Sequence, residues 1–292
     1  MNSLDLKNLP AFHSTEEILA HPRFPFARDE FVRAMLALYE HKPFLNRLLL
    51  ETARSVLFGV IMCLHARYDE VDRATWPTLG LITQSTVAMG VASESRVHDL
   101  VSLLIKTGYL ERRAAPRDRR VRILTPTEKM IAQDQDFLVS HHLPLDILFP
   151  HPGYAPIMTR DPAFQLKQRL VSVDLFALGA QILAGNPIMA LFQSRDAGVM
   201  ILIKMIQMAG GQGGAEPLKV SYSDMGDRFG VSRTHVRKLL VAAEEMGLVR
   251  LTKAGGQFVE LMPPLLQAFD RLVADAMSGH DLCYNLALRA AG

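Results

Sequence analysis

The chain has 292 residues and a formal net charge of +2, and hydrophobic residues make up 49% of it. This balance allows a sizeable core and excludes both wholesale disorder and a general polycation, although it leaves room for a local basic patch. Two cysteines, Cys63 and Cys283, are too few for a disulfide framework or a structural zinc site. The composition is therefore that of an intracellular protein.

The first 28 residues contain three prolines and one expected helix, at residues 14–20, with Ser14 or Thr15 as its cap. They lack a basic segment followed by an apolar one, so we expect no secretory signal. The longest apolar runs, at residues 56–64 and 199–203, are far shorter than the roughly 20 residues of a membrane-spanning helix. A cytoplasmic protein without a membrane partner is expected.

The sequence repeats itself, with a first copy at residues 29–125 and a second at residues 173–264. In each copy a proline, Pro43 or Pro187, lies ten residues before an alanine that begins an apolar helical stretch. Further on, a glycine follows a matching helix in each copy. Two amphipathic segments can resemble each other by chance, but the shared order of these landmarks favours a duplication.

The second copy predicts two helices followed by a hairpin. Residues 223–229 form a short helix that Gly230 ends, because glycine readily adopts a positive φ. Ser232 caps a second, longer helix with a single apolar stripe. Strand-like runs at residues 248–251 and 258–261 are joined by a hairpin turn. This order is typical of a winged helix-turn-helix.

The first copy has the same order of elements. Its short helix is expected at residues 83–89, its turn at residues 90–91, and its longer helix at residues 94–106 behind the cap Ser93. Its strands are expected at residues 110–113 and 121–124, with the wing tip at 114–120. We therefore predict a mainly α fold: two winged helix-turn-helix domains with small β-hairpin wings, linked by a helical layer.

Proline content suggests where the chain divides. Residues 1–140 hold an N-terminal helical segment and the first winged helix-turn-helix, with its core at residues 53–127. Residues 141–163 contain five prolines, so we expect an irregular linker there and not a helix. Residues 164–292 hold the second winged helix-turn-helix, with its core at residues 197–262. A final helix at residues 265–277 carries an apolar stripe that is expected to join the two copies.

Residues 108–125 contain Gly-Tyr-Leu-Glu-Arg-Arg, then Pro-Arg-Asp-Arg-Arg, then Leu-Thr. This run resembles the wing signature of MarR-type bacterial transcription regulators, and the similarity extends over residues 83–127. The resemblance implies that Asp118 fixes the hairpin and that Arg119 or Arg120 lies at the minor groove. The second copy resembles winged-helix regulators more generally and lacks this Asp-Arg wing.

Members of that family are usually about half as long and form dimers, so the chain resembles a pseudo-dimer within one chain. A monomer is expected, with a homodimer as the alternative. The partner that the resemblance implies is double-stranded DNA, and the regulation is transcriptional. It also implies a small aromatic or lipophilic ligand, which the sequence does not identify.

Polar and cationic side chains gather where such a domain would meet DNA. The second recognition helix begins with Arg233 and Arg237, and arginine can make two hydrogen bonds to guanine. The first carries Glu94 and Asp99, which would repel phosphate, although Glu94 could accept a hydrogen bond from cytosine. The wings reverse this imbalance, because residues 111–122 carry a local charge of +4 and residues 249–260 only +1. An asymmetric operator is expected. The residues expected at the DNA are Ser93, Ser95, Arg96, His98, Arg112, Arg113, Arg117, Arg119, Arg120, Arg122, Ser232, Arg233, Thr234, His235, Arg237, Lys238, Arg250 and Lys253.

Other chemical signals are weak. Residues 209–214 are glycine-rich but lack the Lys-Ser or Lys-Thr of a phosphate loop, so a flexible connection is expected. His141, His142 and His151 have no carboxylate or cysteine at ligand spacing, so we expect surface histidines and no metal or cofactor. One cysteine lies in an apolar helix and is expected in the core, whereas Cys283 is open between core and redox sensing. No catalytic constellation stands out, so an enzyme is not expected.

Two readings also remain for particular features. His98 and His235 are either DNA contacts or plain surface residues. The chief functional alternative is a tandem winged-helix scaffold that binds protein segments, as in chromosome-segregation machines. Six wing arginines favour DNA, because such a scaffold has no need of them.

Overall fold

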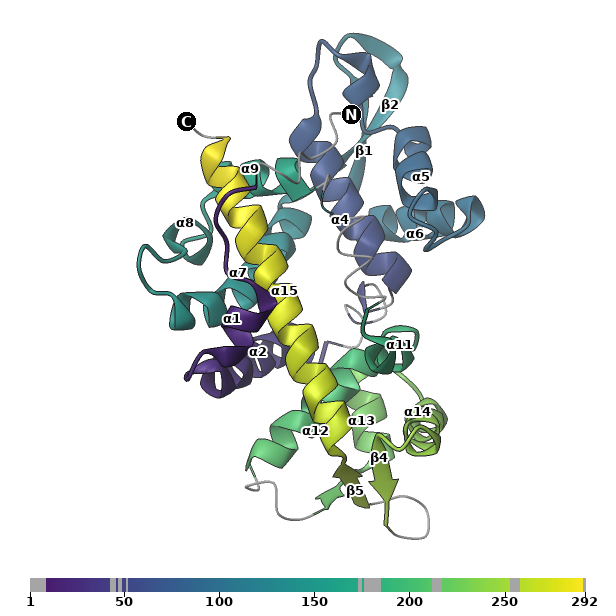
Figure 1. The fold of residues 1–292 in the computed structure, drawn as a ribbon. Coiled ribbons are helices and arrows are strands. Elements are labelled where there is room, and N and C mark those ends of the chain that lie inside the picture. The colour runs from purple at the N-terminus through teal and green to yellow at the C-terminus, as the bar shows by residue number, and fades with distance from the viewer. Residues whose placement is uncertain are drawn as a thin grey trace.

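The computed structural model describes residues 9–42, 46, 49–50, 52–172, 175, 185–211, 217–252 and 258–290. This part of the chain is mainly helical, with two small antiparallel sheets (Figure 1). None of its helices combines the length and the hydropathy needed to cross a lipid bilayer. The predicted fold class is confirmed at this coarse level.

The elements of the first half are α1 (Thr15–Ala20), α2 (Phe24–Tyr39), α4 (Thr52–Arg67), α5 (Leu79–Val87), α6 (Glu94–Lys106), β1 (Leu110–Ala115), β2 (Asp118–Pro126) and α7 (Glu128–Leu148). Those of the second half are α8 (Ala155–Met158), α9 (Pro162–Ser172), α11 (Pro187–Gln193), α12 (Gly198–Gly211), β3 (Leu218–Lys219), α13 (Tyr222–Phe229), α14 (Arg233–Glu245), β4 (Val249–Leu251), β5 (Phe258–Leu261) and α15 (Pro263–Arg289).

Helix starts and ends follow local chemistry. The hydroxyl of Ser14 accepts from the Glu17 N–H at 3.2 Å, and the Glu17 carboxylate accepts from the Ser14 N–H at 2.7 Å, so Ser14 caps α1. Ser93 and Ser232 cap α6 and α14 as predicted, because their hydroxyls accept the N–H groups of Arg96 and His235. Gly230 ends α13 with a φ of 74°, a left-handed conformation that costs glycine little.

Residues 79–126 (the first unit) and 218–261 (the second unit) share backbone hydrogen bonds at corresponding positions. Where α6 ends, the Tyr109 N–H donates to the Leu104 carbonyl at 2.9 Å, and where α14 ends, the Leu248 N–H donates to the Ala243 carbonyl at 2.9 Å. After each hairpin the chain returns to the residue that precedes the first hairpin strand. Two bonds of 3.0 Å mark this return, from Thr127 N–H to the Tyr109 carbonyl and from Met262 N–H to the Leu248 carbonyl.

The sheets differ by one strand. In the second unit the strand order is β3-β5-β4, with Leu218 opposite Val259. Just before the first unit, Pro77 takes the place of β3, and its carbonyl accepts from the Leu124 N–H at 2.9 Å. Proline has no N–H to return a second bond, so only β1 and β2 form a ladder there.

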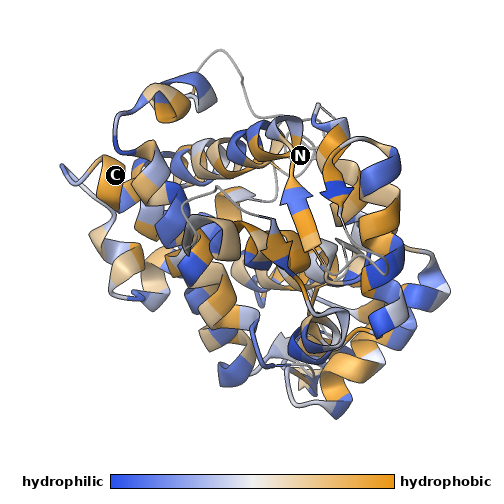
Figure 2. Cartoon of the chain, turned by 90° about the horizontal axis from the view of Figure 1, so that it is seen from below, coloured by the Kyte–Doolittle hydropathy of each residue, from blue (hydrophilic) through white to orange (hydrophobic). Residues whose placement is uncertain are grey.

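Helices α1, α2, α7, α9 and α15 form a helical layer that joins the units (Figure 1). Helix α2, which lies before α4 in the chain, packs against α12 of the second half. Conversely, α9, which lies before α12, packs against α4 of the first half. The helices that follow the two units, α7 and α15, pack against each other. One hydrophobic cluster therefore includes residues of both halves. Figure 2 shows that many helices carry hydrophilic residues on one side and hydrophobic residues on the other.

The structure corrects the predicted linker at residues 141–163. Helix α7 continues through Pro144 to Leu148, although Pro144 lacks the N–H that would bond one turn back. Leu145 is fully buried and Leu148 nearly so, and this burial offsets the lost hydrogen bond. The irregular part is confined to the segments around the short helix α8.

Other boundaries also shift. Helix α15 runs to Arg289 because buried residues such as Leu282 and Ala287 continue its apolar face past the predicted end. Helix α5 begins at Leu79, where Thr78 caps it, and ends before the predicted residue 89. The strands of the first hairpin are longer than expected and leave a tip of residues 116–117. Residues 253–257 of the predicted second hairpin turn and residues 212–214 of the glycine-rich segment lie outside the described residues. Residues 209–211 end α12 and are not the flexible connection that was expected.

Candidate nucleic-acid interface

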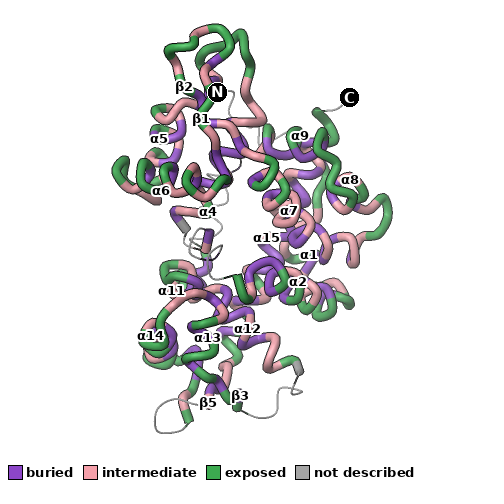
Figure 3. The backbone as a smooth tube through the Cα atoms, turned by 180° about the vertical axis from the view of Figure 1, so that it is seen from behind, coloured by how far each residue is buried: buried purple, intermediate pink, exposed green. Residues whose placement is uncertain are grey.

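Helices α6 and α14 lie on the same side of the molecule in two opposite views (Figures 1 and 3). The β1–β2 hairpin lies at one end of the molecule and β4 and β5 at the other, while α7, α8 and α9 lie on the side away from α6 and α14. One side of the molecule thus presents both helices, with a hairpin near each end.

The N-terminal turns of α14 are cationic and open. Ser232 accepts the His235 N–H at 3.1 Å, which fixes the first turn. Arg233, Arg237 and Lys238 are exposed, as is Thr234. None of the three cations makes an ion pair within the described part of the chain. These side chains are free to meet an external anion or base edge.

His235 is held within the protein. Its Nε2 lies 2.9 Å from the carbonyl oxygen of Asp196, in the turn before α12, and the residue is only partly exposed. This contact ties α14 to the second half's own scaffold. Arg195, next to that turn, is exposed beside α14. Sequence reasoning did not include it among the candidate residues, because nothing local connects residue 195 to α14.

The start of α6 is less suited to an anion. Ser93, Ser95 and His98 are exposed, whereas Arg96 is half-buried. Exposed acids at residues 94 and 99 flank them. The expected contrast between the two helices is therefore present in the exposed side chains.

The first hairpin is the most basic element. All six of its arginines are exposed, but three of them face an acid: Arg113 pairs with Glu111, Arg117 with Glu70 at 3.7 Å, and Arg120 with Asp118 at 3.3 Å. Solvent-exposed pairs of this kind are weak and exchange readily. The other three arginines of the hairpin make no ion pair with any residue that the structure describes; they are Arg112, Arg119 and Arg122.

Asp118 stabilises the hairpin tip. Its Oδ1 accepts the backbone N–H of Arg120 at 3.1 Å, and its side chain is mostly buried. Beneath it, Trp76, Ala115 and Ile123 form a small hydrophobic cluster, separate from the main core. Trp76 was not expected to have a role here, since it lies far from the hairpin in sequence.

The second hairpin offers less charge. Arg250 is exposed but lies 2.9 Å from Glu260, its cross-strand neighbour. Lys253, the other cation expected there, lies outside the described residues. Among the described residues of the second unit, the exposed cations without an ion pair are Arg233, Arg237 and Lys238 of α14 and Lys219 of β3.

The histidines of α7 are not surface residues, contrary to expectation. His141 and His142 are buried, and their ring centroids lie 4.5 and 5.3 Å from that of the partly exposed His280 of α15. Their Nδ1 atoms bond to the carbonyls of Phe137 and Leu138 at 2.9 and 2.8 Å. Burial lowers the pKa of both His141 and His142 to about 4, so they are neutral near neutral pH.

The remaining candidates behave as follows. Cys63 is buried as predicted, and this burial raises the pKa of its thiol to about 12. Cys283 is partly buried, and the Ser172 hydroxyl lies 3.8 Å from its sulfur. His151 is exposed. None of the described His, Cys, Asp and Glu side chains group as a metal-ligand set.

The chain matches no protein-family model, no curated protein and no solved structure.

Proposed function

We propose that the chain is a sequence-specific DNA-binding transcription regulator. In this proposal the first and second units are winged helix-turn-helix domains of the MarR type, and their helical layer makes one chain into a pseudo-dimer. The observation that carries it is the placement of two matched units with exposed cations along one side of the molecule.

The helical layer supports the pseudo-dimer. Helix α2 of the first half packs on α12, and α9 of the second half packs on α4, so each half contributes a helix to the other. Such a reciprocal exchange fixes the distance between α6 and α14 within one chain. The units can then bind one duplex without a second copy of the protein, by occupying a promoter and blocking or recruiting polymerase.

The unequal charge of the units predicts an asymmetric site. The first unit would bind chiefly through its hairpin, where Arg119 pairs with no acid among the residues that the structure describes, and the second chiefly through Arg233 and Arg237 of α14. Phosphate contacts supply affinity that depends on salt, whereas bidentate arginine contacts supply base preference.

Selection of bound fragments from random duplex DNA by the purified chain, at near-physiological salt, tests this function. Enrichment of one motif with two unequal halves is expected. A perfect palindrome would point to a homodimer that uses one unit per half-site. No enrichment would contradict sequence-specific binding and would favour a protein-interaction scaffold.

A further inference from the structure

Glu40 joins the first half of the chain to two helices of the second half. It follows α2 directly, and its carboxylate pairs with Lys204 of α12 at 2.9 Å and with Arg228 of α13 at 2.5 Å. The three side chains are 16–24% exposed, so solvent screens these pairs less than pairs on the open surface. Burial acts to raise the pKa of Glu40, but hydrogen bonds from Lys204 and Arg228 lower it below its usual value, and the carboxylate is charged near neutral pH.

Hydrogen bonds to the backbone add a second contact at the same place. The His41 N–H donates to the Arg228 carbonyl at 3.2 Å, and the Asn46 side-chain amide donates to the same oxygen at 3.4 Å. A carbonyl in the last turn of a helix has no partner within that helix, so donors from outside satisfy it. Here both donors come from the first half. We call Glu40, His41, Lys204 and Arg228 the clasp.

Contacts, and not local preference, hold the segment after α2. His41 has a φ of 59°, a left-handed conformation that few residues other than glycine adopt. Such a conformation is strained and persists only where the surrounding structure fixes it. The path of the chain after α2 is therefore determined by its contacts with the second half.

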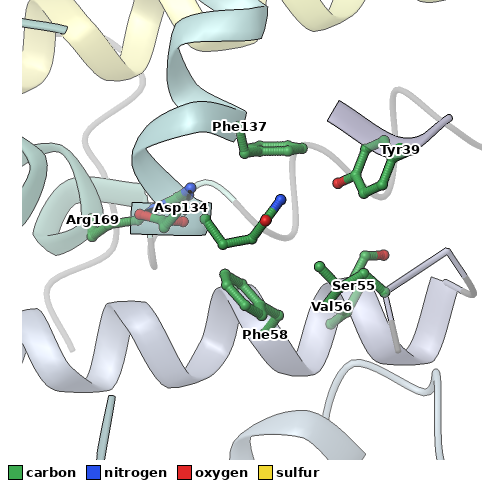
Figure 4. Close-up of a pocket in the computed structure, with 10 residues that line it drawn as sticks. Tyr39, Ser55, Val56, Phe58, Asp134, Phe137 and Arg169 are labelled. Carbon is green, nitrogen blue, oxygen red and sulfur yellow. Dashed lines mark hydrogen bonds and ion pairs between the residues drawn. The ribbon is translucent and has the colours of Figure 1, made fainter. Parts of the chain in front are cut away.

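The clasp is also anchored in the helical layer. Tyr39, the last residue of α2, is buried and lines a cavity of about 220 Å³ with Phe58 of α4 and Phe137 of α7 (Figure 4). Helix α2 packs against α7, and α4 packs against α5 and β2 of the first unit. Glu40 thus directly follows a residue that is fixed among the helices supporting the first unit.

A tight turn connects the clasp to α14. The Val231 N–H donates to the Gly226 carbonyl at 3.0 Å, and Gly230 between them has a φ of 74°. A Cβ on Gly226 would lie 2.6 Å from the Val231 carbonyl oxygen, so α13 and the turn are in close contact. Arg228 lies at the end of α13, and Arg233 begins α14. A shift of Arg228 is therefore expected to turn α14 with it.

The first half holds α14 at a second point. His235 Nε2 lies 2.9 Å from the Asp196 carbonyl oxygen, and the next N–H, of Ala197, donates to the Leu50 carbonyl at 3.4 Å. Leu50 lies before α4, in the first half. Without the clasp, this second contact would remain and α14 would be free to pivot about it.

We propose that Glu40 is a positioning residue that fixes the direction of α14 relative to α6, and so determines the number of base pairs between the two halves of the DNA site. The effect on DNA rests on the proposed function. The direction of α14 can be measured without DNA, so failure of this inference and failure of the proposed function are distinguishable.

The distance between the two helices tests the geometry without DNA. Spin labels are attached through Ser95→Cys in α6 and Thr234→Cys in α14, both at exposed positions. A Cys283→Ser background leaves the buried Cys63 as the one native cysteine. Double electron–electron resonance on the full chain is expected to give one narrow distance distribution with Glu40 present, and a broader or shifted one in Glu40→Gln.

Two further variants make this measurement specific. Glu16→Gln is the matched control, because Glu16 also pairs with an arginine across the two halves, Arg271 of α15 at 3.0 Å, but at the surface. Its distribution should equal that of the parent. Glu40→Asp retains the charge and is expected to restore most of the narrow distribution. Equal distributions with Glu40 and in Glu40→Gln would overturn the proposal.

A spacing series tests the effect on DNA. One base pair is added or removed between the halves of the selected duplex, which rotates one half by about 35°, since 10 to 10.5 base pairs make one turn. The wild type is expected to lose about tenfold in affinity, because the arginine contacts of one unit are misaligned. Glu40→Gln should lose less than about threefold, because α14 adjusts its direction. Competition binding measures both ratios.

The ratio between spacings separates positioning from folding. A variant that is only less stable has a smaller active fraction, binds every duplex less and keeps the wild-type ratio. That result for Glu40→Gln would overturn the proposal, and urea titration gives its stability separately. If the chain selects no DNA sequence, the proposed function and the effect on spacing both fail, whereas the resonance measurement still decides whether Glu40 holds α14.

Discussion

Arg169 of α9 and Asp134 of α7 form a buried, bidentate ion pair between the two halves of the chain. Their atoms lie 2.6 and 3.0 Å apart, and the side chains are 9% and 1% exposed. The pair aligns the helix that leads into the second half with the helix that leaves the first unit. Variants of this pair therefore test how strongly the stability of the protein depends on the contact between its two halves.

Removing one partner of this pair is expected to destabilise the protein. Arg169→Met or Asp134→Asn should lower the free energy of unfolding by about 3–5 kcal/mol, since a buried charge or donor is left unpaired. The double variant Asp134→Leu with Arg169→Met should recover most of this loss. Urea titration measures all three.

The matched control uses the exposed pair between Arg160 and Asp136, two residues further along α7, at 2.9 Å. Arg160→Met should cost no more than about 1 kcal/mol. Equal losses for Arg160→Met and Arg169→Met would show that burial does not determine the contribution of the inner pair.

Base preference is expected to depend on the start of α14. Arg233→Ala and Arg237→Ala should each cost about 1–3 kcal/mol on the selected duplex and relax the preference at one position. Competition binding on single-base variants of the duplex measures this. Arg271→Ala, on α15 and paired with Glu16, is the control. A loss that is equal on every sequence would show contacts to phosphate only.

Salt dependence is expected to depend on the first hairpin. Arg119→Ala should weaken binding to all duplexes and reduce the slope of log affinity against log salt by about one. Arg113→Ala should reduce the slope less, because the Glu111 carboxylate already neutralises part of that charge. Fluorescence anisotropy over a salt series gives both slopes. A slope unchanged by Arg119→Ala would remove the hairpin from the interface.

Stability is expected to fall in mild acid through the buried histidines. Histidine in the unfolded chain has a pKa of about 6.5, whereas burial holds the pKa of His141 and His142 near 4 in the folded protein. Above the unfolded pKa both states are neutral and nothing changes. Between about 6.5 and about 4 only the unfolded state gains protons, so each histidine removes about 1.4 kcal/mol per pH unit.

Carboxylates also gain protons as the pH falls, and this also changes stability. Replacement of one buried histidine isolates the contribution of the histidines. His142→Gln should reduce the loss of unfolding free energy between these two pKa values, and His151→Gln, at an exposed position, should not. Urea titrations at a series of pH values measure both. The same pH dependence in His142→Gln and the wild type would show that His142 is protonated without unfolding.

Local signals predicted much of the fold. The caps Ser93 and Ser232 and the turn glycine Gly230 act within a few residues of themselves, so their chemistry can be inferred from sequence. The path of α7 through Pro144 could not be predicted, because it depends on burial against α2 and α15. Non-local packing of this kind overrides local propensity.

The charged residues of the candidate interface could be predicted from the sequence, but the contacts that hold them in place could not. Arginine-rich residues after a helix-turn-helix pattern mark the hairpin directly. The Trp76 cluster beneath it and the Asp196 carbonyl that holds His235 join segments far apart in the chain. The cavity lined by Tyr39, Phe58, Phe137 and Arg169 lies between α2, α4, α7 and α9, so no single stretch of sequence indicates it.

In the proposed function, one chain binds one duplex with both units. Native mass spectrometry of the chain on its selected duplex tests this most directly. One chain per duplex, with binding weakened by Arg119→Ala in the first unit and by Arg233→Ala in the second, is the predicted result. Two chains on a palindromic duplex, with only one unit's variants affecting binding, would contradict it.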